Sequence, residues 1–157
     1  MLLNRVLIVC AAIASLAMLS CASHRSEERV ETPMLMTATA EVNPDVDGRP
    51  SPIVVRVLQL RGDTEFLGAD FFALYGNEKG TLGESLVQRD EYVLRPGEQR
   101  DVRLWVASDT RFVGVISGFR DINVARWRAL QPREHHLFHK ERIRISLDRS
   151  GLMLSWK

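Results

Sequence analysis

Short segments with alternating apolar and polar residues recur from residue 34 to the end of the chain, and this pattern limits the fold more than any other feature. Alternation places every second side chain on the same face of a strand, so that one face is buried and the other meets water. In residues 141–147 the inward set is Ile143, Ile145 and Leu147. Strands are predicted at residues 34–40, 52–60, 89–94, 100–106, 111–119, 141–147 and 152–156.

Turn-forming residues lie between several of these strands. Residues 95–98 read Arg-Pro-Gly-Glu. Pro-Gly at the centre of four residues favours a type II turn, because Pro presets φ and Gly accepts a positive φ. We therefore expect a hairpin between residues 89–94 and 100–106. Residues 148–151 (Asp-Arg-Ser-Gly) are expected to join the last two strands.

Residues 70–87 interrupt the alternating pattern and predict two short helices. Asp70 is a candidate N-cap and Gly76 a candidate end for the first helix. Residues 81–84 (Thr-Leu-Gly-Glu) form a capping-box pattern, which predicts a second helix at residues 85–87. The expected fold is therefore all-β: a β-sandwich of seven or eight strands, with a short helical insertion between strands 2 and 3 that closes one end.

The chain begins with a targeting segment. Residues 6–19 are an uncharged apolar run, shorter than the roughly 20 residues of a transmembrane helix. The run ends at Ser20-Cys21, a small residue before a cysteine, as in the signal peptides of bacterial lipoproteins. We expect residues 1–20 to be removed and Cys21 to be acylated, because only a thiol forms the thioether to the lipid. Ordinary secretion with cleavage after Ala22, and an uncleaved anchor, are the alternatives.

Acylation would set the location of the protein. Several acyl chains together give effectively permanent membrane anchoring. The residue after Cys21 is Ala22 rather than Asp, the inner-membrane retention signal, so we expect the outer membrane, on its periplasmic side. Residues 21–33 would then be the lipidated N-terminus and a flexible tether. Residues 34–157 would form the folded domain, which contains no cysteine and so no disulfide.

Charge and motifs argue against several classes of function. The chain has 21 basic and 20 acidic residues, interspersed rather than gathered in a basic stripe, so we expect no nucleic-acid partner. The signatures of serine hydrolases, zinc metalloproteases, P-loop NTPases and dinucleotide-binding folds are absent from the sequence. We therefore expect neither an enzyme nor a cofactor.

Two segments contain potential metal ligands. His135, His136 and His139 lie within five residues of each other, but a preceding proline and the flanking strands favour a solvated loop. Residues 43–48 (Asn-Pro-Asp-Val-Asp-Gly) match the first six positions of a calcium loop. The twelfth position is Val54, where that loop requires a bidentate Glu. We interpret residues 43–48 as a proline-stiffened loop and expect no metal at either segment.

An ordered set of segments points to a known family. The set comprises residues 43–52 (Asn-Pro-Asp through Gly-Arg-Pro-Ser-Pro) with the strand up to residue 60, and residues 69–75, 82–86, 94–98, 114–121 and 127–128. In this order the segments resemble the TssJ family, the outer-membrane lipoproteins of type VI secretion systems. The resemblance covers about residues 21–128.

The resemblance implies a transthyretin-like β-sandwich and a scaffolding role. Family members bind the periplasmic C-terminal region of the IcmF-like inner-membrane protein TssM, and the loop after the first strand carries much of that contact. Here this loop is residues 41–52. A proline-stiffened loop loses little entropy on docking, and its charged side chains offer charge-assisted hydrogen bonds. The residues expected to contact the partner are Asn43, Pro44, Asp45, Val46, Asp47, Gly48 and Arg49.

Three alternatives stay open at this point. The loop could be an exposed connection with no partner. The domain could be a lipid-anchored sandwich that binds a small apolar ligand or another envelope protein. A hydrolase related to transthyretin would need convergent His, Arg and Ser side chains on inward strand positions, whereas His135, His136 and His139 crowd one predicted loop.

Overall fold

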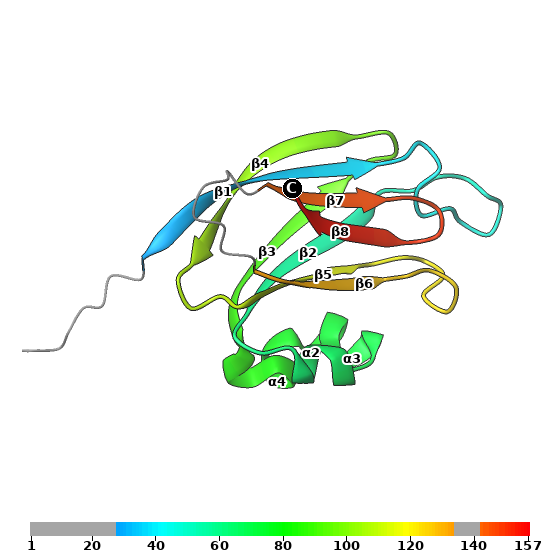
Figure 1. Ribbon diagram of the computed structural model, residues 1–157. Coiled ribbons are helices and arrows are strands. Elements are labelled where there is room, and N and C mark those ends of the chain that lie inside the picture. Colours follow the sequence, from blue (N-terminus) through cyan, green and yellow to red (C-terminus); the bar gives the residue numbers. More distant parts are fainter. Residues whose placement is uncertain (1–27, 134–141) are drawn as a thin grey trace, which may run out of the picture.

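Two four-stranded sheets pack face to face in the computed structural model, which describes residues 28–133 and 142–157 (Figure 1). The first sheet has the order β4 (Gln99–Ala107), β1 (Arg29–Ala38), β7 (Ile143–Leu147) and β8 (Leu152–Trp156). The second has the order β3 (Leu86–Leu94), β2 (Ile53–Leu60), β5 (Phe112–Ser117) and β6 (Arg128–Pro132). The predicted β-sandwich is confirmed, with eight strands in the described part of the chain.

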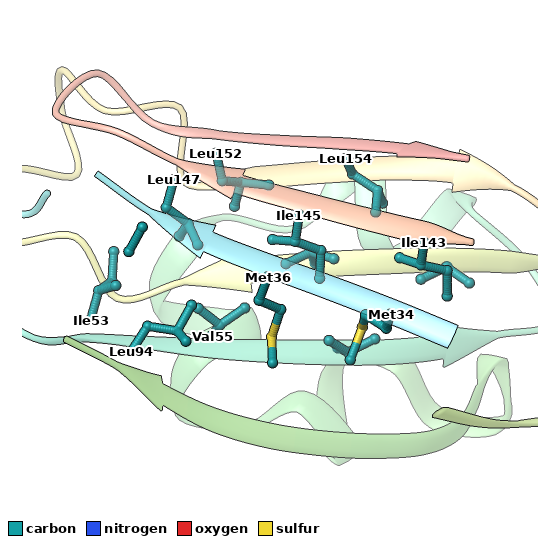
Figure 2. Packing of buried hydrophobic residues seen from close by; sticks show 14 of the residues in the cluster. Met34, Met36, Ile53, Val55, Leu94, Ile143, Ile145, Leu147, Leu152 and Leu154 are labelled. Atoms are coloured by element: carbon teal, nitrogen blue, oxygen red, sulfur yellow. The ribbon is translucent and has the colours of Figure 1, made fainter. Parts of the chain in front are cut away.

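The main core lies between the two sheets, where side chains from both layers point toward one another (Figure 2). In β7 the buried residues are the predicted set, because every second side chain of this strand faces the second sheet. The core residues that Figure 2 labels are Met34, Met36, Ile53, Val55, Leu94, Ile143, Ile145, Leu147, Leu152 and Leu154.

β1 begins at Arg29, earlier than the predicted start at Met34. Its first residues pair with β4 in an antiparallel register that runs from Arg29 opposite Ala107 to Thr37 opposite Gln99. Residues 29–33 of the predicted tether therefore belong to the sheet. The sequence pattern missed them because they lie in an exposed part of the strand that contributes only one buried side chain, a threonine.

The predicted hairpin between the third and fourth strands is wrong, although its turn is present. The backbone N–H of Glu98 donates to the carbonyl of Arg95 at 3.0 Å, and Gly97 has a φ of +74°. β3 pairs with β2 and β4 pairs with β1, so the turn carries the chain from one sheet to the other. Turn chemistry fixes the local reversal but not the partner of each strand.

Three short helices cover the outer face of the second sheet (Figure 1): α2 (Thr64–Gly68), α3 (Phe71–Gly76) and α4 (Glu78–Leu82), followed by a 3₁₀ turn at Gly83–Ser85. The helical insertion between β2 and β3 is confirmed, but it lies on a sheet face and does not close an end of the sandwich. Its apolar side chains form a second core with the sheet, made of Leu58, Leu60, Phe66, Leu74, Leu82 and Ile116. In the described ranges, no helix has the length and apolar character needed to span a bilayer.

The two helix predictions had different outcomes. Asp70 caps α3 as expected, since its carboxylate accepts the N–H of Ala73 at 2.8 Å. The second helix is misplaced: Asn77 caps α4 by accepting the N–H of Gly80, and Leu86 already begins β3. The Thr-Leu-Gly-Glu pattern therefore marks the end of a helix, where Gly83 has a positive φ of +50°.

β5 is covered on both faces, as its continuous apolar sequence predicted. Val113 and Val115 face the main core, whereas Ile116 faces the helices. Gly114 also faces the helices, and a Cβ there would lie 2.9 Å from the ring of Phe66, so the close approach of α2 requires glycine. The neighbouring strand β6 was not predicted from the sequence.

A buried glutamine links the two sheets. The side chain of Gln59 on β2 is fully buried. Its amide nitrogen donates to the carbonyl of Trp105, and its amide oxygen accepts the N–H of Ala107 and the hydroxyl of Thr110, each at 3.0 Å. These three bonds fix the end of β4 against the second sheet, at the end of the sandwich where β1 begins.

Candidate functional site

Besides the turn at residues 95–98, whose Gly97 N–H donates to the carbonyl of Thr39 at 3.0 Å, three loops gather at one end of the sandwich, which we call the distal end. They are residues 39–52 between β1 and β2, residues 118–127 between β5 and β6, and residues 148–151 between β7 and β8. All three lie opposite the end at which β1 begins, at the right of Figure 1. The structure therefore brings the predicted partner-binding loop next to two segments that are distant in the sequence.

Asn43 fixes the base of the first loop. Its side chain is nearly buried, and its φ of +50° places it in the left-handed region that Asn tolerates better than most residues. The side-chain amide nitrogen donates to the carbonyl of Pro52 at 2.9 Å, which closes the loop on itself. The side-chain oxygen accepts the backbone N–H of Arg120 at 2.8 Å, which ties the loop to residues 118–127.

Asp45 organises the tip of this loop. Its carboxylate accepts the backbone N–H groups of Asp47 and Arg49 at 3.0 and 2.9 Å, and the Nε of Arg49 at 2.8 Å. Arg49 also reaches the carboxylate of Asp47 at 2.9 Å, and Gly48 turns the backbone with a φ of +79°. The hydrogen bond from the Arg49 backbone N–H, more than any other cause, holds the pKa of Asp45 below its usual value.

Val46 stands at the tip, fully exposed to solvent. The residues on either side of it are fixed: Pro44 restricts the backbone before it, and Asp45 is held by the bonds to Arg49. The loop is therefore a preformed structure that presents an aliphatic side chain, so docking would order few further groups.

The other two distal loops are also held by hydrogen bonds. The carboxylate of Asp148 accepts the backbone N–H groups of Ser150 and Gly151 at 2.7 and 3.0 Å. The Ser150 hydroxyl bond, together with these backbone N–H groups, lowers the pKa of Asp148. The N–H of Arg126 donates to the carbonyl of Ser150 at 3.0 Å, so that the second and third loops are joined as well.

The side-chain oxygens that the calcium-loop pattern would use as ligands accept hydrogen bonds from other residues of the chain. The side-chain oxygen of Asn43 accepts from Arg120, and the carboxylates of Asp45 and Asp47 bind Arg49. In residues 28–133 and 142–157, no group of three or more His, Cys, Asp or Glu side chains is placed to hold a metal ion.

A cluster of charged residues on the second sheet has a structural role. The guanidinium of Arg56 on β2 donates to the carbonyl of Tyr75 at 2.6 Å and to the carboxylate of Glu91 at 2.7 Å, and it forms an ion pair with Glu78. The bond from Arg56 lowers the pKa of Glu91. The cluster fixes α3 and α4 to β2 and β3.

Several predicted positions lie outside the described residues. They are Cys21 with its signal segment, and His135, His136 and His139. The sequence also gave no reason to single out Asn43 as the residue that joins two loops. Its partner Arg120 falls within one of the segments that resemble the TssJ family, which is the only signal that could have pointed to it.

Fold and site together define a class: a β-sandwich with helices on one outer face and three interlinked loops at one end. The family model of type VI secretion lipoproteins (T6SS-SciN; VasD, EvfM, TssJ) matches residues 31–150. The chain therefore belongs to this family of type VI secretion lipoproteins. Among curated proteins, none matches the chain significantly.

Solved structures with the same fold include family members. The T6SS lipoprotein TssJ1 from Pseudomonas aeruginosa is 30% identical with a TM-score of 0.76, over 83% of this chain and 98% of that chain. Lip from Serratia marcescens, a membrane-bound component of the type VI secretion system, is 31% identical with a TM-score of 0.74, over 83% and 99%. A chain described as the T6SS protein TssM C-terminal domain from EAEC is 23% identical with a TM-score of 0.66, over 80% and 98%, and shows the fold alone.

Proposed function

We propose that the protein is an outer-membrane lipoprotein that scaffolds the type VI secretion membrane complex. In this proposal acyl chains on Cys21 anchor it on the periplasmic side, and the loop of residues 43–49 binds the periplasmic C-terminal region of the IcmF-like inner-membrane protein TssM. No catalytic step is part of the role. Membership of the type VI secretion lipoprotein family supports the proposal.

The position of the loop is the observation that carries it. The chain enters the sandwich at Arg29, and β1 runs from there directly to the distal end. Ten residues of strand span about 33 Å, so the loop lies about that far from the entry point. The eight residue-to-residue steps between Cys21 and Arg29 reach at most about 28 Å. An anchor on Cys21 would therefore hold the domain near the membrane with its loop directed into the periplasm.

The chemistry of the loop favours a partner-binding role over the alternative of an exposed connection with no partner. Connections between strands commonly have about 4–6 residues, whereas this one runs from residue 39 to residue 52. Its polar groups bind each other, and its one aliphatic tip residue, Val46, is left in solvent. A preformed loop with an exposed apolar tip is suited to insertion into a partner surface.

The ligand-binding alternative gains no support from the core. Side chains from the two described sheets pack against each other as one buried cluster, as expected of an ordinary hydrophobic core (Figure 2). The hydrolase alternative requires histidines, and all four histidines of the chain lie outside the described residues.

Val46→Asp tests the docking role of the loop. The side chain has no contacts to lose, so we expect the melting temperature to stay within about 2 °C and the affinity for the TssM periplasmic region to fall at least tenfold. The matched control is Leu67→Asp on α2, another exposed aliphatic position, but on the helical insertion. Equal affinity of the Val46→Asp protein and the wild type, measured by calorimetry, would contradict the docking role.

Cys21→Ser tests the anchor. We expect the variant to lose labelling by radioactive palmitate and to move from the outer-membrane fraction to the soluble periplasmic fraction, because no acceptor for the lipid remains. A variant that stays in the outer-membrane fraction without the label would show that another part of the protein holds it there.

A further inference from the structure

We infer that a pocket between the three distal loops receives an apolar side chain of the partner, and that the partner segment carries a carboxylate beside it. This inference rests on the proposed function and deepens it. It adds a second contact region to the loop of residues 43–49, and it assigns to the partner a segment of stated chemistry.

The pocket has a volume of about 140 Å³ and is partly enclosed. A cavity of about 150 Å³ with apolar walls holds a benzene molecule, so this pocket has room for one leucine or phenylalanine side chain. Most of its wall is apolar. The lining residues are Asn43, Pro44, Phe119, Asp121, Val124, Ala125 and Arg149.

The pocket walls are held in place before any partner arrives. Asn43 fixes the first loop to Arg120, and the N–H of Ala125 donates to the carbonyl of Asp121 at 3.0 Å. Phe119 is nearly buried, whereas Val124 on the wall is 79% exposed. An aliphatic residue in water beside a preformed hollow offers apolar area that a partner side chain would cover.

The charges on the pocket wall indicate which partner it fits. The carboxylate of Asp121 accepts the backbone N–H of Asn123 at 3.2 Å, so it is used within its own loop. The exposed guanidinium of Arg149 makes no hydrogen bond or ion pair with the described residues. Glu41 lines a shallow neighbouring hollow with Arg149 but forms no ion pair with it. A partner carboxylate would bind Arg149 in the bidentate geometry that guanidinium favours.

Three variants test the pocket with the full-length lipoprotein and the TssM periplasmic region as the probe. Ala125→Leu fills the pocket, Val124→Ser removes apolar area at an exposed position, and Arg149→Glu reverses the charge. We expect each to weaken binding at least fivefold, with melting temperatures of Val124→Ser and Arg149→Glu within about 2 °C of wild type. Arg111→Glu is the matched control, since Arg111 is exposed near the opposite end of the sandwich.

The salt dependence of binding distinguishes the ionic contact at Arg149 from the apolar contact at Val124. The effect of Arg149→Glu should shrink from about 0.05 M to about 0.5 M salt, because exposed charges are screened, whereas the effect of Val124→Ser should persist. If Val46→Asp weakens binding and these variants do not, the pocket inference is wrong and the proposed function stands. If Val46→Asp also leaves binding unchanged, both fail. A salt-independent effect of Arg149→Glu would overturn the assignment of a partner carboxylate.

Discussion

Substitution of Asn43 tests how the distal loops are held together. This residue combines a left-handed backbone with two side-chain hydrogen bonds, one to Pro52 and one to Arg120. Asn43→Gly removes both bonds but accepts the positive φ. Asn43→Ala removes both bonds and also strains the backbone. Asn43→Asp keeps an acceptor for the Arg120 N–H and loses the donor to Pro52.

The expected loss in the free energy of unfolding follows from these differences between the three variants. Each lost bond leaves a partly buried backbone group without a partner, at about 1–1.5 kcal/mol when water can reach it in part. Asn43→Gly should therefore lower the free energy of unfolding by about 2–3 kcal/mol. A left-handed alanine adds a net cost of about 1 kcal/mol, so Asn43→Ala should lose about 3–4 kcal/mol. Asn43→Asp loses one bond and gains a repulsion with the carbonyl of Pro52, for about 1–2 kcal/mol.

Urea denaturation followed by circular dichroism measures these differences, with each variant in the same buffer at pH 7. From most to least stable, we expect the wild type, then Asn43→Asp, Asn43→Gly and Asn43→Ala. Equal stability of the Gly and Ala variants would show that the left-handed backbone contributes nothing. If all three variants lie within about 0.5 kcal/mol of wild type, the two hydrogen bonds do not fix the loop, and its preformed character would have to come from Asp45 alone.

Three further predictions concern stability. Gln59→Leu leaves two buried polar groups and one partly buried carbonyl without their partner, so the free energy of unfolding should fall by about 2–4 kcal/mol in urea titration; a loss under about 1 kcal/mol would contradict the sheet-linking role. The lowered pKa of Asp148 and Asp45 adds stability that is present above a pH of about 4 and is lost as pH falls through the folded-state pKa. Asp148→Asn should therefore be less stable than wild type at pH 7, by a margin that shrinks as the pH falls below about 4; an unchanged deficit across the acid range would refute this. Added Ca²⁺ should leave the melting temperature unchanged, since the candidate ligands bind Arg49 or backbone, and a rise of several degrees would overturn that reasoning.

The strands with a regular alternation could be predicted from the sequence. In β7 the burial of Ile143, Ile145 and Leu147 follows directly from the period of two. The cap of α3 by Asp70 could be predicted equally well, because capping depends on residues within one turn of each other. These features share one property: the sequence that decides them is local.

Features that depend on distant partners could not be predicted. The turn at 95–98 has hairpin chemistry, but whether β3 pairs with β4 is decided by β1 and β2, which offer each strand a better partner. β6 is five residues long, half-buried along most of its length, and ends in Pro132, so its own sequence carries no clear alternation. It is a strand because β5 lies beside it with free hydrogen-bonding groups.

The candidate site could also be predicted only in part: its local loop features could be, and its long-range contact could not. Pro44 and Gly48 mark residues 43–49 as a shaped loop, and the family resemblance gives that loop a role. The ring of bonds around Asp45 is local and could in principle be anticipated from an Asp followed by Gly. The bond between Asn43 and Arg120 joins residues 77 positions apart, and only the folded chain shows it.

The parallel pairing of β1 with β7 explains why the candidate site is at the distal end. Parallel neighbours end on the same side of a sheet, so the loop after β1 and the loop after β7 are adjacent. β2 starts at that side, and its antiparallel neighbour β5 ends there, which adds the loop of residues 118–127. The start of β1 must then lie at the other side. An anchor N-terminal to β1 and a surface built from these loops are therefore separated by the full length of a strand, for any sequence that keeps this strand order.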